Sequence, residues 1–224
     1  MPISPDRILY RDDHLLAVHK LPGELVVKGS GKLEKLPLLD FLKKTYPGLH
    51  PLQRLDFETS GVVVFARSSK ILKKVLDTKF DQWKKTYLAV VMGVPRTGAG
   101  LRSANVIRFP LPSRIKGEKI DAVTEYRLIE EFAVASEVEA VITTGRHHQI
   151  RRHFAMIGHP LVLDDEYGDR TFNQRFARQF KYRRFFLHAA AVAFPHPVTG
   201  KMMTVEAAVP RSFEEIRRKL KIEN

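Results

Sequence analysis

Residues 50–67 read H-P-L-Q-R-L-D-F-E-T-S-G-V-V-V-F-A-R, and this stretch decides how the chain is interpreted. A polar turn that contains Arg54 and Asp56 runs directly into the apolar segment 62–66. Because a half-exposed strand would alternate polar and apolar residues, this continuous apolar run predicts a strand buried on both faces. The turn is therefore anchored to a core, and an anchored loop is a common place for functional side chains.

The composition is that of a folded globular protein with a polyanionic partner. Of the 224 residues, 44% are hydrophobic and 28% are charged, which argues against extensive disorder. The formal net charge of +13 favours nucleic acid as the partner over an anionic membrane or a merely solubilising charge. The chain has no cysteine, so disulfides, thiolate nucleophiles and cysteine-based metal sites are excluded.

The length and the apolar runs bound the architecture and the location. No run approaches the roughly 20 apolar residues that cross a bilayer, and the N-terminus lacks a basic segment followed by a hydrophobic one. These features predict a cytoplasmic protein without membrane association. A chain of 224 residues is long enough for a single large core, so we expect one domain over residues 1–224.

Periodicity predicts alternating strands and helices. The helix at 70–82 is expected to begin at a serine cap and to bury Leu76 and Phe80. Residues 95–118 are rich in Gly, Pro, Arg and Ser and are expected to be irregular. The predicted strands are 8–10, 15–18, 62–66, 84–93, 122–130 and 133–143, and the predicted helices are 36–46, 70–82, 149–156 and 170–184. In the helix at 149–156 Ile150 is expected to face the core, while Arg151 and Arg152 emerge near its start.

The helix predicted at 170–184 is amphipathic. Phe172, Phe176 and Phe180 recur at every fourth position, while six residues of the segment are basic and none is acidic. We expect the phenylalanines to lie in the core. The basic face is then the best candidate for an RNA contact, and binding to a membrane surface is the competing interpretation.

Three stretches together resemble the RluA family of pseudouridine synthases. Residues 54–64, R-L-D-F-E-T-S-G-V-V-V, resemble the signature R-L-D-x-x-T-S-G. Residues 145–168, G-R-H-H-Q-I-R-R-H-F-A-M-I-G-H-P-L-V-L-D-D-E-Y-G, resemble the family's G-R-T-H-Q-I-R-x-H-x-x-x-x-G-H-P-I-x-G-D-x-x-Y-G. Residues 84–93, K-K-T-Y-L-A-V-V-M-G, are similar to its K-x-Y-x-A-x-V-x-G strand. The motifs occur in the family's order over nearly the whole chain, which makes the resemblance specific.

The resemblance implies an α+β pseudouridine synthase fold, with a mixed, mostly antiparallel sheet and flanking helices. The end of the chain also resembles the family's L-H-A…F-x-H-P…P ending, which implies a hairpin over residues 186–210 followed by a helix over 212–221. It implies an isomerase that needs no cofactor and acts on a uridine that has left its stack in ribosomal or transfer RNA. The family often carries a small RNA-binding module ahead of its first motif. Here that motif is matched by residues 12–23, which leaves no room for a separate N-terminal module.

The resemblance also implies roles for individual residues. Asp56 would be the nucleophile, Tyr87 would pack on the target base, and Arg151 would pair with Asp56. Such a pair would keep the carboxylate ionised, as nucleophilic attack requires, although a purely structural ion pair has the same residues. The substrate-contacting positions would be Arg54, Arg146, His148, Gln149 and Ile150.

Two rival functions remain open from the sequence. A hydrolytic glycosidase usually needs two carboxylates several ångströms apart, and Glu58 is too near Asp56 to be an obvious partner. The second rival is a non-catalytic RNA-binding relative, which a substitution of Asp56, Tyr87 or Arg151 would have favoured. The histidines of residues 147–159 show neither an i, i+4 pair nor an H-E-x-x-H pattern, so no metal site is predicted.

Three departures from the family pattern bear on the substrate. Gln53 stands where the family usually has His, His147 replaces the usual Thr or Ser, and Leu163 replaces the usual Gly. None of the three removes a catalytic group. The first two bear on RNA contacts, and the choice between ribosomal and transfer RNA stays open. We predict RNA as the partner, with no obligate protein partner.

Overall fold

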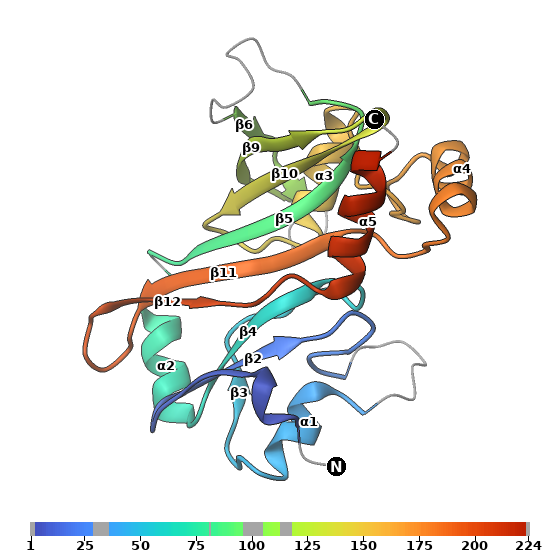
Figure 1. Ribbon diagram of the computed structural model, residues 1–224. Helices are drawn as coiled ribbons and strands as arrows, with labels where there is room; N and C mark the ends of the chain where they lie inside the picture. Colours follow the sequence, from blue (N-terminus) through green and yellow to red (C-terminus); the bar gives the residue numbers. More distant parts are fainter. Residues whose placement is uncertain (1–2, 29–35, 81, 96–104, 113–117, 223–224) are drawn as a thin grey trace. The chain divides into compact units, whose positions relative to one another are not determined.

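The computed structural model in Figure 1 describes residues 3–28, 36–80, 82–95, 105–112 and 118–222. By its internal contacts the chain divides into two compact units. Unit 1 comprises Met1–Lys85 and Ala189–Ala208, and unit 2 comprises Thr86–His188 and Val209–Asn224. Each unit has its own strands, helices and core. That residues 1–224 act as one catalytic domain stays a prediction.

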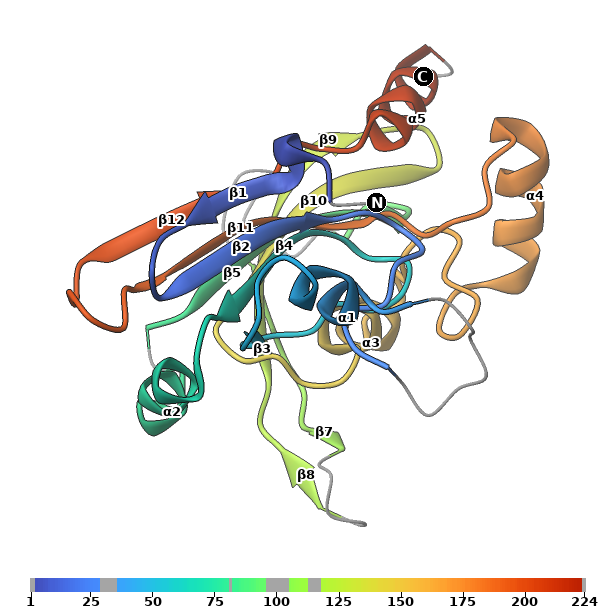
Figure 2. The same cartoon turned by 90° about the horizontal axis from the view of Figure 1, so that it is seen from below.

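Unit 1 is built on strands in the order β1-β2-β4-β11, with β3 paired to β4 and β12 to β11. Figure 2 shows β1, β2 and β4 side by side. The pairs β1/β2, β2/β4, β3/β4 and β11/β12 are all antiparallel. The elements are η1 Pro5–Arg7, β1 Ile8–Arg11, β2 Leu15–Lys20, α1 Leu38–Lys43, β3 His50–Pro51, β4 Ser60–Ala66, α2 Ser69–Asp77, β11 Leu187–Pro195 and β12 Met202–Glu206.

Strand β4 is buried on both faces, as its sequence predicts, and all seven of its residues belong to the interior. On one face Val62 and Val64 pack in a cluster with α2 and with Trp83. On the other face Val63 and Phe65 pack in a cluster with α1. Because helices cover both faces, the strand holds its N-terminal end, and the turn that precedes it, in a fixed place.

The helix predicted at 70–82 begins as expected but ends too early. The Ser68 hydroxyl caps it by accepting a hydrogen bond from the Ile71 N–H at 3.3 Å. The prediction that it reaches residue 82 is wrong, since α2 stops at Asp77 and left-handed residues such as Phe80, with φ 61°, follow. Leu76 is half exposed rather than inside, whereas Phe80 packs edge-on against Trp83 after the helix has ended.

Unit 2 has strands in the order β5-β10-β9-β6 and a short pair, β7 with β8. The pairs β9/β10 and β6/β9 are antiparallel, and the α+β class predicted from the sequence is confirmed. The elements are β5 Lys84–Met92, β6 Asn105–Arg108, β7 Leu111–Pro112, β8 Lys119–Ile120, β9 Val123–Glu131, β10 Ala135–Ile142, α3 Gln149–Met156, α4 Arg170–Phe180 and α5 Arg211–Ile222.

The segment 95–118 was expected to be irregular, and for its described part this is wrong. Strand β6 pairs with β9, and its residues alternate, with Asn105 and Ile107 buried and Val106 and Arg108 exposed. A run of four residues is too short for the alternation to stand out against the Gly, Pro and Arg around it. The other part of this expectation, at 96–104 and 113–117, lies outside the described residues.

Helix α4 has the predicted apolar stripe but is shorter than predicted. Phe176 and Phe180 are buried in a cluster with Phe213 of α5, and Phe172 packs at its edge. The helix ends at Phe180 because Lys181 adopts a left-handed conformation, with φ 54°, so the basic residues 181–184 follow the helix instead of continuing it.

Gly61 gives a test of how closely the strands of unit 1 approach. Its φ is +117°, and an added Cβ would lie 2.2 Å from the Ala189 carbonyl oxygen of β11. We expect Gly61→Ala to lower the free energy of unfolding by about 3 kcal/mol or more, because the Ala189 carbonyl cannot move aside without disturbing the paired strands. Gly200→Ala is the control, with φ +71° and open space around it, and should cost about 1 kcal/mol. Equal losses in urea unfolding would contradict the close approach.

Candidate active site

The Asp56 turn lies in unit 1 between β3 and β4. Asp56 is partly buried, and Arg54 is exposed. The Asp56 carbonyl accepts a hydrogen bond from the Thr59 N–H at 3.1 Å, and β4 begins at the next residue. The carboxylate is therefore carried by a tight turn on a fully buried strand, the kind of support that holds a reactive group in place.

Lys20 holds the backbone of this turn through hydrogen bonds, a role that was not predicted from the sequence. The side chain is fully buried at the end of β2, and its ammonium donates to the carbonyls of Phe57 at 3.0 Å, Thr59 at 2.5 Å and Leu21 at 3.1 Å. Burial lowers the pKa of Lys20 to about 8, although nearby carboxylates that include Asp56 oppose the shift. The signal in the sequence was a lysine at the end of an apolar strand, inside a motif that the family shares.

Gln53 makes contact with the same strand. Its side-chain nitrogen donates to the Val62 carbonyl at 3.0 Å, while its buried Oε1 has no hydrogen-bond partner among the described residues. The hydroxyl oxygen of Thr59 is buried and unsatisfied in the same way. Each such oxygen lowers the free energy of unfolding by about 1–3 kcal/mol, so the residues around this turn are not optimised for stability.

Helix α3 occupies the residues predicted for it and begins after a left-handed residue, His148, with φ 52°. The Gln149 side chain braces this start. Its Oε1 accepts hydrogen bonds from the Arg146 N–H at 3.1 Å and the Thr144 hydroxyl at 2.7 Å, and its Nε2 donates to the Val123 carbonyl at 2.9 Å. These bonds give Gln149 a structural role in unit 2, and its contact with substrate stays a prediction.

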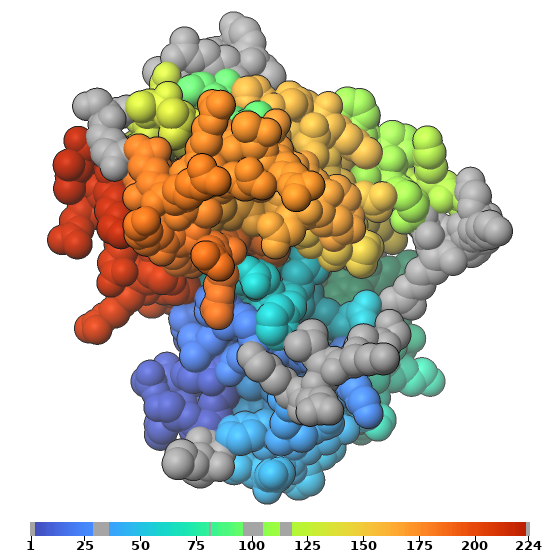
Figure 3. Space-filling view, turned by 90° about the vertical axis from the view of Figure 1, so that its right-hand side faces the viewer, coloured from blue at the N-terminus to red at the C-terminus, as the bar shows by residue number. Residues whose placement is uncertain are grey.

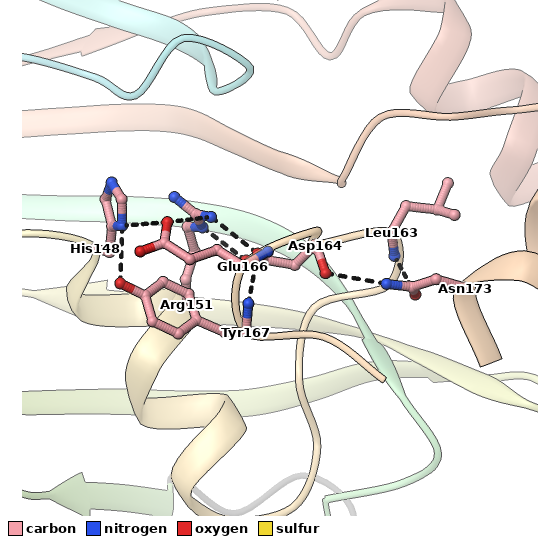
Figure 4. A network of polar contacts seen from close by, with 7 residues as sticks. All are labelled: His148, Arg151, Leu163, Asp164, Glu166, Tyr167 and Asn173. Atoms are coloured by element: carbon pink, nitrogen blue, oxygen red, sulfur yellow. Dashed lines mark hydrogen bonds and ion pairs between the residues drawn. The ribbon is translucent and has the colours of Figure 1, made fainter. Parts of the chain in front are cut away.

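Arg151 was expected to emerge from the start of α3, and that expectation is wrong. Its side chain is 8% exposed, because a buried carboxylate receives it. Nε lies 2.6 Å from Asp164 Oδ2 and Nη2 lies 2.8 Å from Asp164 Oδ1, which is a bidentate ion pair (Figure 4). Glu166 adds a contact at 3.3 Å, and the guanidinium lies 5.0 Å from the ring centre of Tyr167 and 4.8 Å from that of Phe185.

Asp164 is fully buried and closes its own turn. Its Oδ1 accepts hydrogen bonds from the backbone N–H groups of Glu166 at 3.0 Å and Tyr167 at 3.1 Å. Burial by itself raises the pKa of Asp164, but the bonds from Arg151 and from the turn outweigh it, so the pKa lies below its usual value. The carboxylate is therefore ionised at neutral pH beside Arg151.

His148 joins the other side of this network. Its Nδ1 lies 3.1 Å from the Tyr167 hydroxyl and 3.2 Å from Glu166 Oε2 (Figure 4). Burial and the neighbouring Glu166 raise the pKa of Tyr167 to about 12, so the phenol stays protonated. The ring of His147 stacks on that of His148, with centroids 3.7 Å apart. The sequence showed the D-x-x-Y-G motif but gave Asp164, Glu166 and Tyr167 no role.

The remaining histidines of this segment have structural partners. His153 is fully buried, between the Thr124 hydroxyl at 2.9 Å and the Phe109 carbonyl at 3.1 Å, and His159 Nδ1 lies 2.9 Å from the Met92 carbonyl. Within the described ranges no three side chains of the metal-binding types gather in one place. No helix in the same ranges has the length and apolar character to cross a membrane.

The predicted site residues fall into two groups. Arg54 and Asp56 belong to unit 1, and Tyr87, buried on β5, belongs to unit 2 with the remaining five. Those five are gathered at the start of α3, where Ile150 is buried and His148 and Arg151 share the contact with Glu166. The pairing of Asp56 with Arg151 stays a prediction. The five residues at the start of α3 named above as one group are Arg146, His148, Gln149, Ile150 and Arg151.

Replacement of Asp164 tests the anchoring of Arg151. Asp164→Asn keeps an acceptor for the turn but removes the charge, so we expect a loss of about 3 kcal/mol in the free energy of unfolding at pH 7. Because the folded pKa is lowered, the carboxylate stabilises the fold above its unfolded pKa and loses this effect as pH falls through the folded value. The acid-induced loss should therefore be smaller in the variant. Asp165→Asn, at an exposed neighbour, should change neither quantity.

Two buried lysines give a matched pair. Lys85 on β5 is 8% exposed, and burial lowers its pKa to about 8. We expect Lys85→Met to raise the free energy of unfolding at pH 7 by about 1–3 kcal/mol, since burial deprives the ammonium of hydration. Lys20→Met should lower it by about 2 kcal/mol, because three carbonyls lose their donor.

The pH dependence of these variants gives a second readout. Each lysine has a folded pKa below its unfolded value of 10.5, so the unfolded state holds more protons between about pH 8 and 10.5. Wild-type stability should gain from each lysine as pH rises through that window. Either methionine variant should show a smaller gain in urea unfolding. An undiminished gain in Lys85→Met would contradict the lowered folded pKa of Lys85.

Comparison with known proteins gives the family. A sequence profile described as RNA pseudouridylate synthase matches residues 14–156. The chain is 34% identical over 221 residues to ribosomal large subunit pseudouridine synthase C of Vibrio vulnificus, which covers 96% of this chain and 70% of that protein. It is 35% identical over 219 residues to the protein of that name from Salmonella typhimurium, with 93% and 68% covered.

Solved structures agree on the fold. The human protein RNA Pseudouridylate Synthase Domain Containing 4 matches with a TM-score of 0.77 and 24% identity, over 96% of this chain and 93% of that one. Human RNA Pseudouridylate Synthase Domain Containing 1 matches with a TM-score of 0.71 and 22% identity, over 99% and 98%. The profile and the identity to the bacterial relatives confirm the resemblance that the motifs carried: the chain belongs to the RluA family of RNA pseudouridine synthases, which are isomerases.

Proposed function

We propose that this pseudouridine synthase modifies one or a few uridines of large-subunit ribosomal RNA, with Asp56 as the nucleophile, Tyr87 against the base and Arg151 as the ionic partner of Asp56. The observation that carries the proposal is the anchored arginine: a guanidinium with an ionised carboxylate on one edge, in a motif of the family. The choice of RNA follows the names of the bacterial relatives, which are ribosomal large subunit enzymes.

The proposed reaction is an isomerisation in which atoms and charges balance without a co-reactant. The Asp56 carboxylate forms a covalent bond to the uridine, at the sugar or at the ring, and the bond between sugar and N1 breaks. The uracil turns in the site and rejoins the sugar through carbon 5. The proton on carbon 5 then leaves, assisted by Tyr87, while N1 gains a proton and Asp56 is released.

The fixed arginine suits this chemistry for an electrostatic reason. Asp164 holds Nε and Nη2, so the plane of the guanidinium is set before substrate arrives. A cation that needs no reorganisation stabilises an ionised carboxylate, and it does so more strongly where water is excluded. Arg151 is 6% exposed as a residue, which meets that condition. The ordinary cost of a buried cation is offset by Asp164.

Basic side chains support RNA as the substrate. The net charge of +13 suits a polyanion, and the exposed residues Arg170, Arg175 and Arg178 lie on α4. Figure 3 shows the orange segment of the chain, to which α4 belongs, at the surface. We propose α4 as an RNA contact, together with Arg54, Arg146, His148, Gln149 and Ile150. We further propose one catalytic domain that acts in the cytoplasm without a cofactor or an obligate protein partner.

The test is a map of pseudouridine in cellular RNA with and without the gene. We expect one or a few sites in ribosomal RNA to be lost, and to return with the wild-type chain but not with Asp56→Asn, because the amide is a far poorer nucleophile. Asp77→Asn, at an exposed position of α2 outside the motifs, should restore them fully.

Other outcomes separate the rivals. If Asp56→Asn restored the lost pseudouridine sites fully, Asp56 would not be the nucleophile, and a non-catalytic RNA-binding role would be favoured. Free uracil released from RNA by the purified chain would favour a hydrolytic glycosidase. Lost sites that fall only in transfer RNA would contradict the proposed substrate while leaving the reaction in place.

A further inference from the structure

The turn that carries Asp164 begins with a strained residue. Leu163 has φ +65°, a left-handed conformation that costs any side chain with a Cβ and that glycine adopts freely. Glycine is what the family pattern has at this position. Leu163 is also 5% exposed and packs in the core of unit 2, so its conformation must be held by its surroundings.

A single side chain, Asn173 of α4, holds this backbone. Its Oδ1 accepts a hydrogen bond from the Leu163 N–H at 2.8 Å, and its Nδ2 donates to the Asp164 carbonyl at 3.0 Å (Figure 4). Both ends of the amide are therefore used on two consecutive residues. Asn173 is itself fixed, because its N–H donates to the Asp169 carbonyl at 2.9 Å in the first turn of α4.

The surrounding backbone is shaped to admit this amide. A Cβ at Gly168 would lie 2.6 Å from Asn173 Nδ2 and 2.2 Å from the Asp164 carbonyl oxygen. The Gly168 N–H also donates to that carbonyl at 3.0 Å. Glycine is thus required here for the close approach of the turn and the helix. Asn173, Gly168 and the Asp164 carbonyl build this contact together, and the two hydrogen bonds to the carbonyl fix the position of the Asp164 backbone.

From Asp164 the chain of contacts leads directly to Arg151. The main chain of Asp164 is held by Asn173, and its carboxylate is the bidentate partner of Arg151 at 2.6 and 2.8 Å. A rotation of the Leu163–Asp164 peptide would move both carboxylate oxygens. We propose that Asn173 is a positioning residue that sets the orientation of the Arg151 guanidinium through Asp164. Its consequence for turnover rests on the proposed function of Arg151.

Hydrogen exchange at arginine Nε tests the positioning without any assay of activity. The Arg151 Nε–H donates to Asp164, so its proton should exchange slowly with solvent. In a protein labelled with ¹⁵N-arginine, the Arg151 signal is identified as the one that is missing from the spectrum of Arg151→Lys. We expect Asn173→Ala to speed this exchange at least tenfold. Gln174→Ala, at the exposed next residue of α4, is the matched control and should match wild type. Unchanged exchange in Asn173→Ala would overturn the proposal.

Turnover gives the second readout. We expect Asn173→Ala to lower kcat for RNA about 10- to 100-fold with KM within about twofold, since a small misplacement of a charged group acts on the chemical step. Asn173→Ser keeps a small polar group that can donate or accept and should lose less, which also covers the case in which the alanine variant folds poorly. In an Arg151→Lys background Asn173→Ala should add no further loss.

The outcomes separate this inference from the function on which it rests. An additive loss of kcat in the double variant would mean that Asn173 acts independently of Arg151, and it would overturn the proposal. A wild-type chain that forms no pseudouridine would sink the proposed function instead, while the exchange measurement would still decide whether Asn173 positions Arg151.

Discussion

The ion pair between Arg151 and Asp164 is the constraint on which the candidate site of unit 2 depends. Both partners are buried, and each would be costly alone, so the two must be placed together. The turn, the two flanking aromatic rings and the first turn of α4 all serve that placement. A buried cation held by a buried anion has little freedom, and this rigidity is what electrostatic stabilisation of a reacting carboxylate requires.

Unit 1 solves the equivalent problem for Asp56 by different means. Its rigidity comes from packing on both faces of β4 and from Lys20, whose ammonium satisfies three backbone carbonyls beneath the turn. No carboxylate is needed below the turn, because backbone oxygens solvate the lysine. One unit thus fixes a candidate anion with a buried cation and apolar packing, and the other fixes a cation with a buried anion.

Elements with a strong periodic signal were predictable from the sequence, and those decided by single residues were not. The apolar run of β4 and the bounds of α3 follow from local patterns. The early end of α2 and the strand β6 do not, since the first depends on left-handed residues and the second on pairing with β9. The motifs indicated Arg151, but its burial was invisible because Asp164 is distant by thirteen residues and its role is set by tertiary contact.

Leu163 has an evolutionary consequence. A chain with glycine at this position bears no conformational strain there, whereas a chain with leucine needs the amide of residue 173 to hold the strained backbone as well as to place Asp164. The effect of a substitution at one position therefore depends on the residue at the other. Leucine gains apolar burial in the core at the cost of this dependence, so the loss of Asn173 should cost more stability beside leucine than beside glycine.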